Sequence, residues 1–394
     1  MRGEAIYIKS SHQLPIVEKK KIAIFAEKLY GGGVEKILQI VCGNFDYRHY
    51  DLTLYASREE DMPSGTYPEH LTVKYIFDRG NGLWTKMKNT LKLFVYYHFS
   101  PSFYYKLFIR KRYDIGIAFI EGYATRFLSG APTGMKKIGW VHIELDTFHW
   151  TDVAFRSRQE EVDCYQRLDR IVCVSQTVKN QVDALFCRPD VTKVVYNPIE
   201  KDKILVQSEE PLPAAYATRK HSIRMVSLGT LNKRKSYDRL LVAVNRLIKN
   251  GCDVELMILG SGEEQDSLKS YIAENGLEDS VYMVGFVHNP YPFVKSADIY
   301  VCSSYAEGYN TAVTEALILG KAVVSTEVSG IREQLGEHSD YGIVTENSVD
   351  GLYLGLEQMC HDGTFLHYQA KAREVSDRYN LQAQMNQIYQ MIES

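Results

Sequence analysis

Short apolar and β-branched runs alternate with longer amphipathic segments along most of this 394-residue chain. Such alternation predicts strands joined by helical crossovers, which is the arrangement of a parallel α/β sheet covered on both faces. A first series of strands is expected at 21–26, 50–56, 71–77, 113–120, 136–142, 170–175 and 191–197. A second series is expected at 223–229, 253–260, 281–286, 299–304, 321–326 and 341–345. The pattern therefore predicts two consecutive doubly wound sheets.

A polar, proline-containing stretch, 200–222, separates the two series of strands. We expect one domain over 1–200 and a second over 201–375, because each is long enough to bury its own core. The remaining 376–394 has the apolar spacing of a helix. Doubly wound sheets bind ligands beyond the C-terminal ends of their strands. Two such domains facing each other would hold a ligand in the cleft between them.

Charge and cysteine content narrow the class of protein. A net charge of −3 gives no general reason to expect a nucleic acid partner. The seven cysteines are scattered and form no C-x-x-C pair, which is typical of reduced thiols in a cytosolic protein. Residues 1–20 lack the apolar stretch of a signal peptide, and no uncharged run is long enough to span a bilayer. We therefore expect a cytoplasmic enzyme.

The stretch from Glu307 to Glu315 places two carboxylates eight residues apart across a glycine-led turn. It follows an expected strand and opens an apolar-periodic helix that stops at Gly320. Unpaired backbone N–H groups and the helix dipole favour an anion such as phosphate at this turn. The carboxylates could then hold hydroxyl groups on either side of a diphosphate, as a nucleotide-sugar requires. The alternative is an ordinary loop with two solvated glutamates.

Glycines and a histidine stand at the ends of two expected strands of the first domain. Gly31, Gly32 and Gly33 follow the first strand, where they would let the backbone approach a ligand. Lys36 occupies the last position of G-x-G-x-x-G, which disfavours simple dinucleotide binding. His142 closes the strand at 136–142, on the side of the cleft. A flexible turn and a structural histidine are the respective alternatives.

Similar signals follow two strands of the second domain. The run Lys233, Arg234 and Lys235 comes shortly after a strand and could neutralise a diphosphate. A solvated surface loop is the alternative. Gly260 and Gly262 flank a serine at the next strand end, again leaving room for a ligand.

Together, these motifs resemble glycosyltransferase family 4, retaining enzymes with the GT-B fold. The resemblance covers about residues 20–380 and is strongest over 223–333, where the E-x(7)-E pattern is highly specific. It implies two Rossmann-like domains facing across a cleft, with the last helix crossing back to the first domain. It also implies transfer of a hexose or N-acetylhexosamine from a nucleotide-sugar to a saccharide acceptor in cell-surface polysaccharide assembly. UDP is the expected carrier because most bacterial donors for such enzymes carry it.

The resemblance also implies roles for individual residues. Glu307 and His142 would hold the transferred sugar, Lys235 the diphosphate, and Glu315 the ribose. Further donor contacts are implied for Gly32, Gly33, Thr230, Lys233, Arg234, Gly260, Gly262, Phe286, Tyr309, Asn310 and Thr311. Thr230 stands where the family has arginine, so we expect Lys233 or Arg234 to compensate. The chain has no D-x-D motif, which together with the lysine predicts electrostatic catalysis without a divalent metal or other cofactor.

A second unusual stretch runs from Trp84 to Tyr113. Its 30 residues contain seven Lys or Arg, ten aromatic residues and no acidic residue, in two expected helices separated at 100–102. Cations interleaved with aromatic residues suit an anionic membrane interface. The patch expected to face the membrane or acceptor comprises Trp84, Lys86, Lys88, Lys106, Arg110, Lys111 and Arg112. Its alternatives are an amphipathic helix pair packed on the first domain and, less consistent with the sequence, a site for single-stranded nucleic acid.

Because the resembled family binds its acceptor in the first domain, this patch suggests a lipid-linked acceptor such as a polyprenyl diphosphate-sugar. We accordingly expect a peripheral protein at the cytoplasmic face of the inner membrane. Two other classes remain open. One is a non-catalytic nucleotide-sugar-binding subunit, for which Thr230 is the support. The other is a different nucleotide-sugar enzyme of this fold, such as an epimerase or a phosphorylase.

Overall fold

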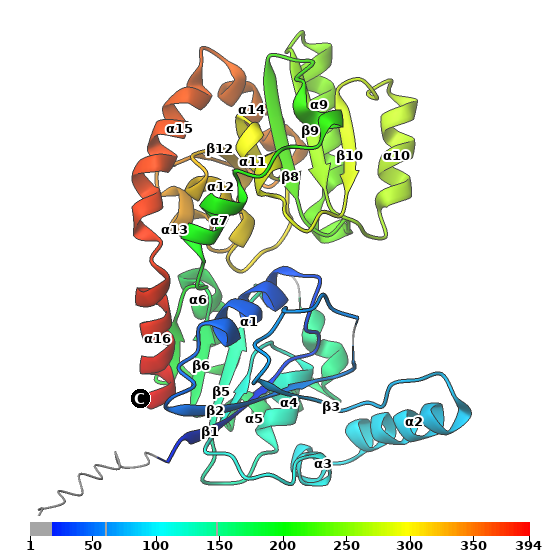
Figure 1. Ribbon diagram of the computed structural model, residues 1–394, viewed down its shortest axis with the longest axis vertical. Helices are drawn as coiled ribbons and strands as arrows, with labels where there is room; N and C mark the ends of the chain where they lie inside the picture. The colour runs from blue at the N-terminus through cyan, green and yellow to red at the C-terminus, as the bar shows by residue number, and fades with distance from the viewer. Residues whose placement is uncertain (1–17, 60, 147–148) are drawn as a thin grey trace, which may run out of the picture.

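The computed structural model describes residues 18–59, 61–146 and 149–394. Residues 1–17, which include most of the stretch expected to lack a signal peptide, lie outside the described residues. Figure 1 shows two lobes stacked along the long axis of the molecule, with the chain passing between them twice.

Each lobe is built on one parallel sheet. Among the described residues, the first sheet has seven strands in the order β3-β2-β1-β4-β5-β6-β7, and the second has six in the order β10-β9-β8-β11-β12-β13. The strands of the first are β1 (Lys20–Phe25), β2 (Tyr50–Ala56), β3 (Thr72–Tyr75), β4 (Ile115–Ala118), β5 (Lys136–Val141), β6 (Arg170–Cys173) and β7 (Thr192–Val194). The strands of the second are β8 (Ile223–Leu228), β9 (Val254–Leu259), β10 (Val281–Gly285), β11 (Ile299–Cys302), β12 (Ala322–Thr326) and β13 (Ile343–Thr345). Every predicted strand is present, and the first strand of each series lies inside its sheet, so the predicted doubly wound architecture is confirmed.

Helices connect the strands and cover both sheets. In the first lobe they are α1 (Gly33–Gly43), α2 (Leu83–His98), α3 (Pro101–Phe108), α4 (Tyr123–Ser129), η1 (Trp150–Ala154), α5 (Arg158–Gln166) and α6 (Gln176–Phe186). The second lobe begins with α7 (Lys201–Gln207), α8 (Ala214–Ala217), η2 (Lys233–Lys235), α9 (Tyr237–Lys249), α10 (Gln265–Glu274) and α11 (Tyr291–Ser296). It ends with α12 (Thr311–Ile318), α13 (Ile331–Leu335), α14 (Val349–Cys360), α15 (Thr364–Val375), η3 (Ser376–Arg378) and α16 (Leu381–Glu393).

The stretch expected as a polar linker, 200–222, contains two of these helices. One residue of α7, Ile204, is buried in a small apolar cluster with Ile199, Tyr291 and Ile318. The polar composition of the stretch reflects the exposed face of α7, while this cluster fixes the helix to the second lobe.

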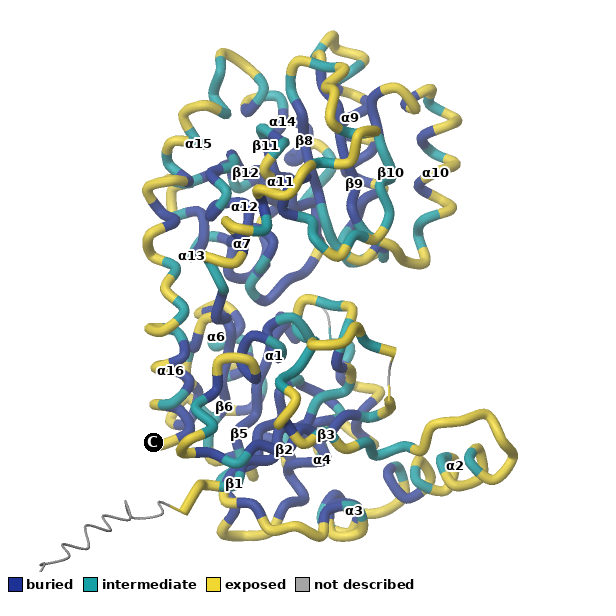
Figure 2. Tube along the Cα trace, viewed as in Figure 1, coloured by how far each residue is buried: buried dark blue, intermediate teal, exposed yellow. Residues whose placement is uncertain are grey.

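Each sheet buries its own apolar core, which Figure 2 shows as dark blue tubes inside both lobes. The final helix, α16, belongs to the core of the first lobe although it follows the second in sequence, because Met385 and Ile388 pack there. The Lys136 side chain donates hydrogen bonds to the carbonyls of Met391 and Ile392, at 3.1 and 2.8 Å. Among the described residues, no helix combines the length and apolarity needed to cross a bilayer.

Candidate functional site

The Glu307 turn joins the two lobes. It follows β11 and leads into α12, whose N-cap residue Asn310 accepts the backbone N–H of Ala312 at 3.0 Å. A side chain at Gly308 would collide with the backbone carbonyl of His142, so this close approach requires glycine. The turn of the second lobe is thereby pressed against the end of β5 in the first.

Glu307 is buried, with 7% of its surface exposed, and its carboxylate is surrounded by donors. Lys235 Nζ lies 2.6 Å from one oxygen and Arg234 lies 3.1 Å from the other, while Ser304 donates at 2.7 Å. Burial alone would raise the pKa of Glu307, but the charges of Lys235 and Arg234 and these hydrogen bonds lower it to about 2. The carboxylate is therefore ionised and fixed before any ligand arrives.

Only some residues of the basic run after β8 contact Glu307, and the others are exposed to solvent. Lys235 and Arg234 point at Glu307, and Arg234 also donates to the Ala306 carbonyl at 2.9 Å. Lys233 and Thr230 are exposed. Of the two residues expected to compensate for Thr230, Arg234 lies at this turn, whereas Lys233 is exposed.

Glu315, the second carboxylate of the pattern, is buried on α12 with 2% of its surface exposed. It forms an ion pair with Lys36 of α1, and Lys36 Nζ also lies 2.7 Å from the Tyr291 hydroxyl. Burial lowers the pKa of Lys36, but the charge of Glu315 outweighs it and holds the pKa above its usual range. In the sequence, Lys36 stands out only because it interrupts a glycine motif, and no local signal predicts its contact with Glu315.

His142 follows β5 and lies beneath the Glu307 turn. Its ring is buried beside Trp140 and Phe119, and burial lowers its pKa to about 3 despite a hydrogen bond with the Phe119 backbone. Its Nε2 has no hydrogen-bond partner among the described residues. The backbone N–H of His142 donates to Glu121 at 2.9 Å. A neutral imidazole with one free nitrogen can accept or donate one hydrogen bond to a ligand.

The predicted glycines lie where backbones approach closely. A side chain at Gly260 would collide with the Gly229 carbonyl, and one at Gly262 with that of Leu231. Gly32 is the N-cap of α1, and the Cβ position of Gly33 faces the Thr311 side chain at 3.9 Å. The Gly32–Gly33 loop and the start of α12 therefore meet across the lobes.

Two further predicted donor residues lie at the margins of this site. Phe286 is exposed beside His288, whose Nδ1 lies 3.0 Å from the Tyr30 hydroxyl of the other lobe. Tyr309 lies near Tyr196, with ring centroids 5.4 Å apart. The structure thus gathers most predicted donor residues at one junction, while Thr230 and Lys233 remain outside the contacts around Glu307.

The predicted membrane patch lies apart from this junction, on α2, α3 and the segment after α3. All seven of its residues are exposed, and α2 extends away from the first lobe in Figure 1. Some aromatic residues of the stretch face inward, including Tyr96, Tyr104 and Tyr105. Others, including Trp84 and Phe94, face solvent. The stretch thus combines packing on the domain with an exposed apolar and cationic face.

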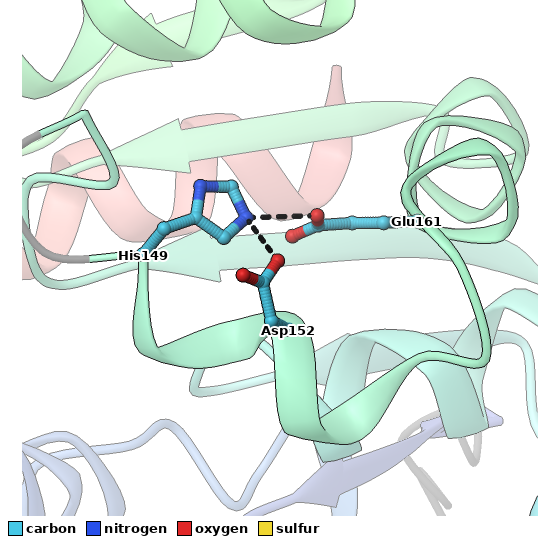
Figure 3. A group of neighbouring side chains, drawn as sticks. All are labelled: His149, Asp152 and Glu161. Atoms are coloured by element: carbon cyan, nitrogen blue, oxygen red, sulfur yellow. Dashed lines mark hydrogen bonds and ion pairs between the residues drawn. The ribbon is translucent and has the colours of Figure 1, made fainter.

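One group of side chains has the composition of a metal site, His149, Asp152 and Glu161 (Figure 3). The His149 Nε2 lies 2.9 Å from Glu161 and 3.4 Å from Asp152. The guanidinium of Arg158 contacts the same Glu161 oxygen and the same nitrogen, and Thr151 donates to the other oxygen at 2.8 Å. Because a cation already occupies the centre of this group, we assign it to the packing of η1 against α5.

Comparison with known proteins places these features in a family context. Residues 208–379 match the family described as glycosyl transferases group 1. An uncharacterized glycosyltransferase of Methanocaldococcus jannaschii is 33% identical over 174 residues, which are 43% of this chain and 43% of the relative. A second relative is the N-acetylgalactosamine-N,N'-diacetylbacillosaminyl-diphospho-undecaprenol 4-alpha-N-acetylgalactosaminyltransferase of Campylobacter jejuni. It is 30% identical over 201 residues, 50% of this chain and 52% of the relative. The matches therefore span about half of these relatives.

Solved structures resemble the whole chain. HepE of Anabaena, in complex with UDP and glucose, superposes with a TM-score of 0.76 at 18% identity and covers 95% of this chain and 100% of its own. WaaG, a glycosyltransferase of lipopolysaccharide biosynthesis, gives a TM-score of 0.66 at 14% identity and covers 93% and 98%. At these identities the likeness establishes the fold alone.

Proposed function

Because residues 208–379 match the glycosyl transferases group 1 family and the chain has a GT-B fold, we propose that the chain is a retaining glycosyltransferase. It moves a hexose or N-acetylhexosamine from a nucleotide-sugar, expected to carry UDP, to a saccharide acceptor in cell-surface polysaccharide assembly. The observation that supports this most is the buried, ionised Glu307, which Lys235 and Arg234 hold in the turn that packs against the His142 strand end.

The proposed chemistry uses the chain's own charges. Lys235, Arg234 and the first N–H groups of α12 stabilise the negative charge that develops on the leaving diphosphate. Glu307 binds hydroxyl groups of the transferred sugar rather than attacking it, because its oxygens are already engaged by Lys235, Arg234 and Ser304. The acceptor hydroxyl attacks the anomeric carbon from the face that the diphosphate leaves, and its proton passes to the leaving phosphate. Configuration is thereby retained without a covalent enzyme intermediate.

The proposed acceptor is lipid-linked, and the protein is proposed to bind the cytoplasmic face of the membrane peripherally. Two observations support this. The α2–α3 stretch presents cations and apolar side chains to solvent. The Campylobacter jejuni relative is named for an acceptor built on diphospho-undecaprenol.

Thermal unfolding in the presence of UDP, GDP, ADP and CMP tests the donor site. A nucleotide at 100 times its dissociation constant adds about 2.7 kcal/mol to the free energy of unfolding. We expect a clear rise in unfolding temperature with UDP and a smaller one with the others. A rise with another nucleotide would change the donor class. If none raises it, the pocket is degenerate, and Thr230→Arg is the first change that should restore binding.

A further inference from the structure

A pocket of about 380 Å³ opens in the first lobe at the C-terminal ends of β1, β2 and β3. This volume is within the range of small-molecule sites. Seven aromatic residues line it, and six of them lie on strands and helices: Phe25, Tyr55, Tyr96, Tyr104, Tyr123 and Phe127. They come from β1, β2, α2, α3 and α4, so the helices of the proposed membrane patch close the pocket.

One wall of the pocket is linked to the strand end that carries His142. The wall residue Tyr123 begins α4 two residues after Glu121, the carboxylate that accepts the His142 backbone N–H and, at 3.1 Å, the Trp150 ring N–H.

The pocket lining carries two exposed cations and one part-buried carboxylate, Glu27. The cations are Lys28 and Arg58, and the Arg58 guanidinium lies 5.6 Å from the centre of the Phe77 ring, another lining residue. Arginine held over an aromatic ring keeps its donors free for a carboxylate or phosphate. An apolar interior beneath a cationic rim suits a molecule with an apolar chain and a phosphate group.

The opposite side of the pocket continues onto the exposed face of α2. Leu93 both lines the pocket and is 37% exposed. An apolar stripe on the same helix has at least 50% of each side chain exposed, and it comprises Leu83, Trp84, Met87, Leu91 and Phe94. At 100° per residue these five positions fall on one face, with Lys86 on one side and Lys88 on the other. Such a stripe rests on lipid, so the helix proposed to contact the bilayer also forms part of the pocket wall.

We propose that this pocket binds the isoprenoid segment next to the phosphate of a polyprenyl-phosphate-linked acceptor, with Lys28 and Arg58 contacting the phosphate. The proposal rests on the proposed function, because it names the binding site of that acceptor. It identifies an isoprenoid site on the first lobe, apart from the carboxylates and cations of the second.

Farnesyl diphosphate, a water-soluble probe, tests the proposal by isothermal titration with the full chain. We expect saturable binding, weakened at least tenfold by Ala124→Phe, which fills the pocket, and by Arg58→Glu, which reverses the rim charge. Leu93→Trp narrows the mouth at a part-exposed position and serves if Ala124→Phe does not fold. Lys193→Glu, an exposed charge reversal on β7 at the other edge of the sheet, is the matched control and should bind normally.

Three outcomes would overturn the proposal: no saturable binding, equal binding by the pocket variants, or displacement of the probe by UDP. If inorganic diphosphate binds as tightly as the probe, the isoprenoid chain of the probe contributes nothing to affinity. The apolar pocket would then not be the binding site. If lysophosphatidylglycerol competes equally well, the pocket binds membrane phospholipid instead of the acceptor. The UDP-induced rise in unfolding temperature is measured on the same samples. Its loss would contradict the proposed donor, whereas its persistence without probe binding would contradict the pocket alone.

Discussion

The two lobes carry different kinds of candidate site. On the second lobe the charges are buried and already paired, as for Glu307 with Lys235. On the first lobe the pocket has aromatic walls, and its cations are exposed at the rim. Paired buried charges fix a geometry before binding and so suit a small polar ligand of constant shape. Aromatic walls with cations at the rim suit an amphiphile, so the difference supports the proposal of a polar donor on one lobe and a lipid-linked acceptor on the other.

The same comparison separates the two carboxylates of the second lobe. Glu307 takes its cations from its own lobe, whereas Glu315 takes Lys36 from the other. One half of the proposed donor site is therefore complete within the second lobe. The other half depends on how the lobes meet, which gives a means of testing each half separately.

The largest effect is expected from Lys235→Ala. Removing this cation takes away charge stabilisation of the leaving group, so we expect turnover to fall about 10²–10³-fold. Arg234 remains beside Glu307, so the fold should persist. Glu307→Gln should act in the same direction. Turnover is measured as sugar transferred per enzyme, and thermal unfolding checks the fold.

Lys249→Ala is the matched control, because Lys249 is an exposed lysine at the end of α9 in the same lobe. It should transfer sugar at the normal rate. If Lys235→Ala or Glu307→Gln also did so, the second lobe would not be the site of charge stabilisation, and the contrast between the lobes would fail.

The next effect concerns the exposed face of the first lobe. Each Lys or Arg near an anionic bilayer contributes about 1 kcal/mol to binding. Reversing Lys106, Arg110 and Lys111 to glutamate should therefore lower co-sedimentation with phosphatidylglycerol vesicles about 100-fold at low salt. Lys111 lies 3.1 Å from Asp51, so it should contribute least of the three.

Raising the salt concentration should weaken vesicle binding of the unaltered protein, because exposed charges are screened. A control with the same change in net charge reverses three exposed lysines elsewhere, namely Lys193, Lys249 and Lys269. The control should still sediment with vesicles. Unchanged sedimentation of the patch variant would rule out this face as the membrane contact.

The sequence could predict what is encoded locally. Every strand followed from the alternation of apolar runs, and the Glu307 turn followed from a glycine between a strand and a helix. The contact of Lys36 with Glu315 could not be predicted, since it joins residues 279 positions apart on different lobes. The aromatic pocket was also missed, because its walls come from several separate segments. The sequence also could not show which cation of the basic run contacts Glu307. That depends on the direction of η2, which turns Arg234 toward Glu307 and Lys233 toward solvent.

Acid should affect the two lobes in different pH ranges. The pKa of His142 falls from 6.5 in the unfolded chain to about 3 through burial, so protonation favours unfolding. Burial of neutral His142 should therefore lower the free energy of unfolding by roughly 1.4 kcal/mol for each pH unit below about 6.5. The pKa of Glu307 is lowered from 4.5 to about 2, where paired cations outweigh burial. The stability it provides is present above pH 4.5 and is lost as the pH falls through 2.

Between pH 6.5 and 4.5, therefore, the slope from these two residues comes from His142 on the first lobe. Chemical unfolding at several pH values in this range, followed for the unaltered protein and for His142→Gln, measures it. The variant should show the shallower dependence. Equal slopes in both proteins would mean that His142 is not buried in its neutral form.

The smallest effect is expected from Lys36→Met, and it tests whether the first lobe completes the donor site. Lys36 is a positioning residue, since its contacts are Glu315 and the Tyr291 hydroxyl. Without it, the Glu315 carboxylate loses its charge partner and is held less firmly for the ribose. We expect UDP affinity to fall about tenfold, or roughly 1.4 kcal/mol, while affinity for inorganic diphosphate stays the same. Tyr291→Phe, which removes a single hydrogen bond to Lys36, should give a smaller loss of the same kind. Calorimetric titration with both ligands separates the outcomes: an equal loss for UDP and diphosphate would place the effect of Lys36 on the phosphates, and no loss for either would mean that the second lobe binds the nucleotide alone.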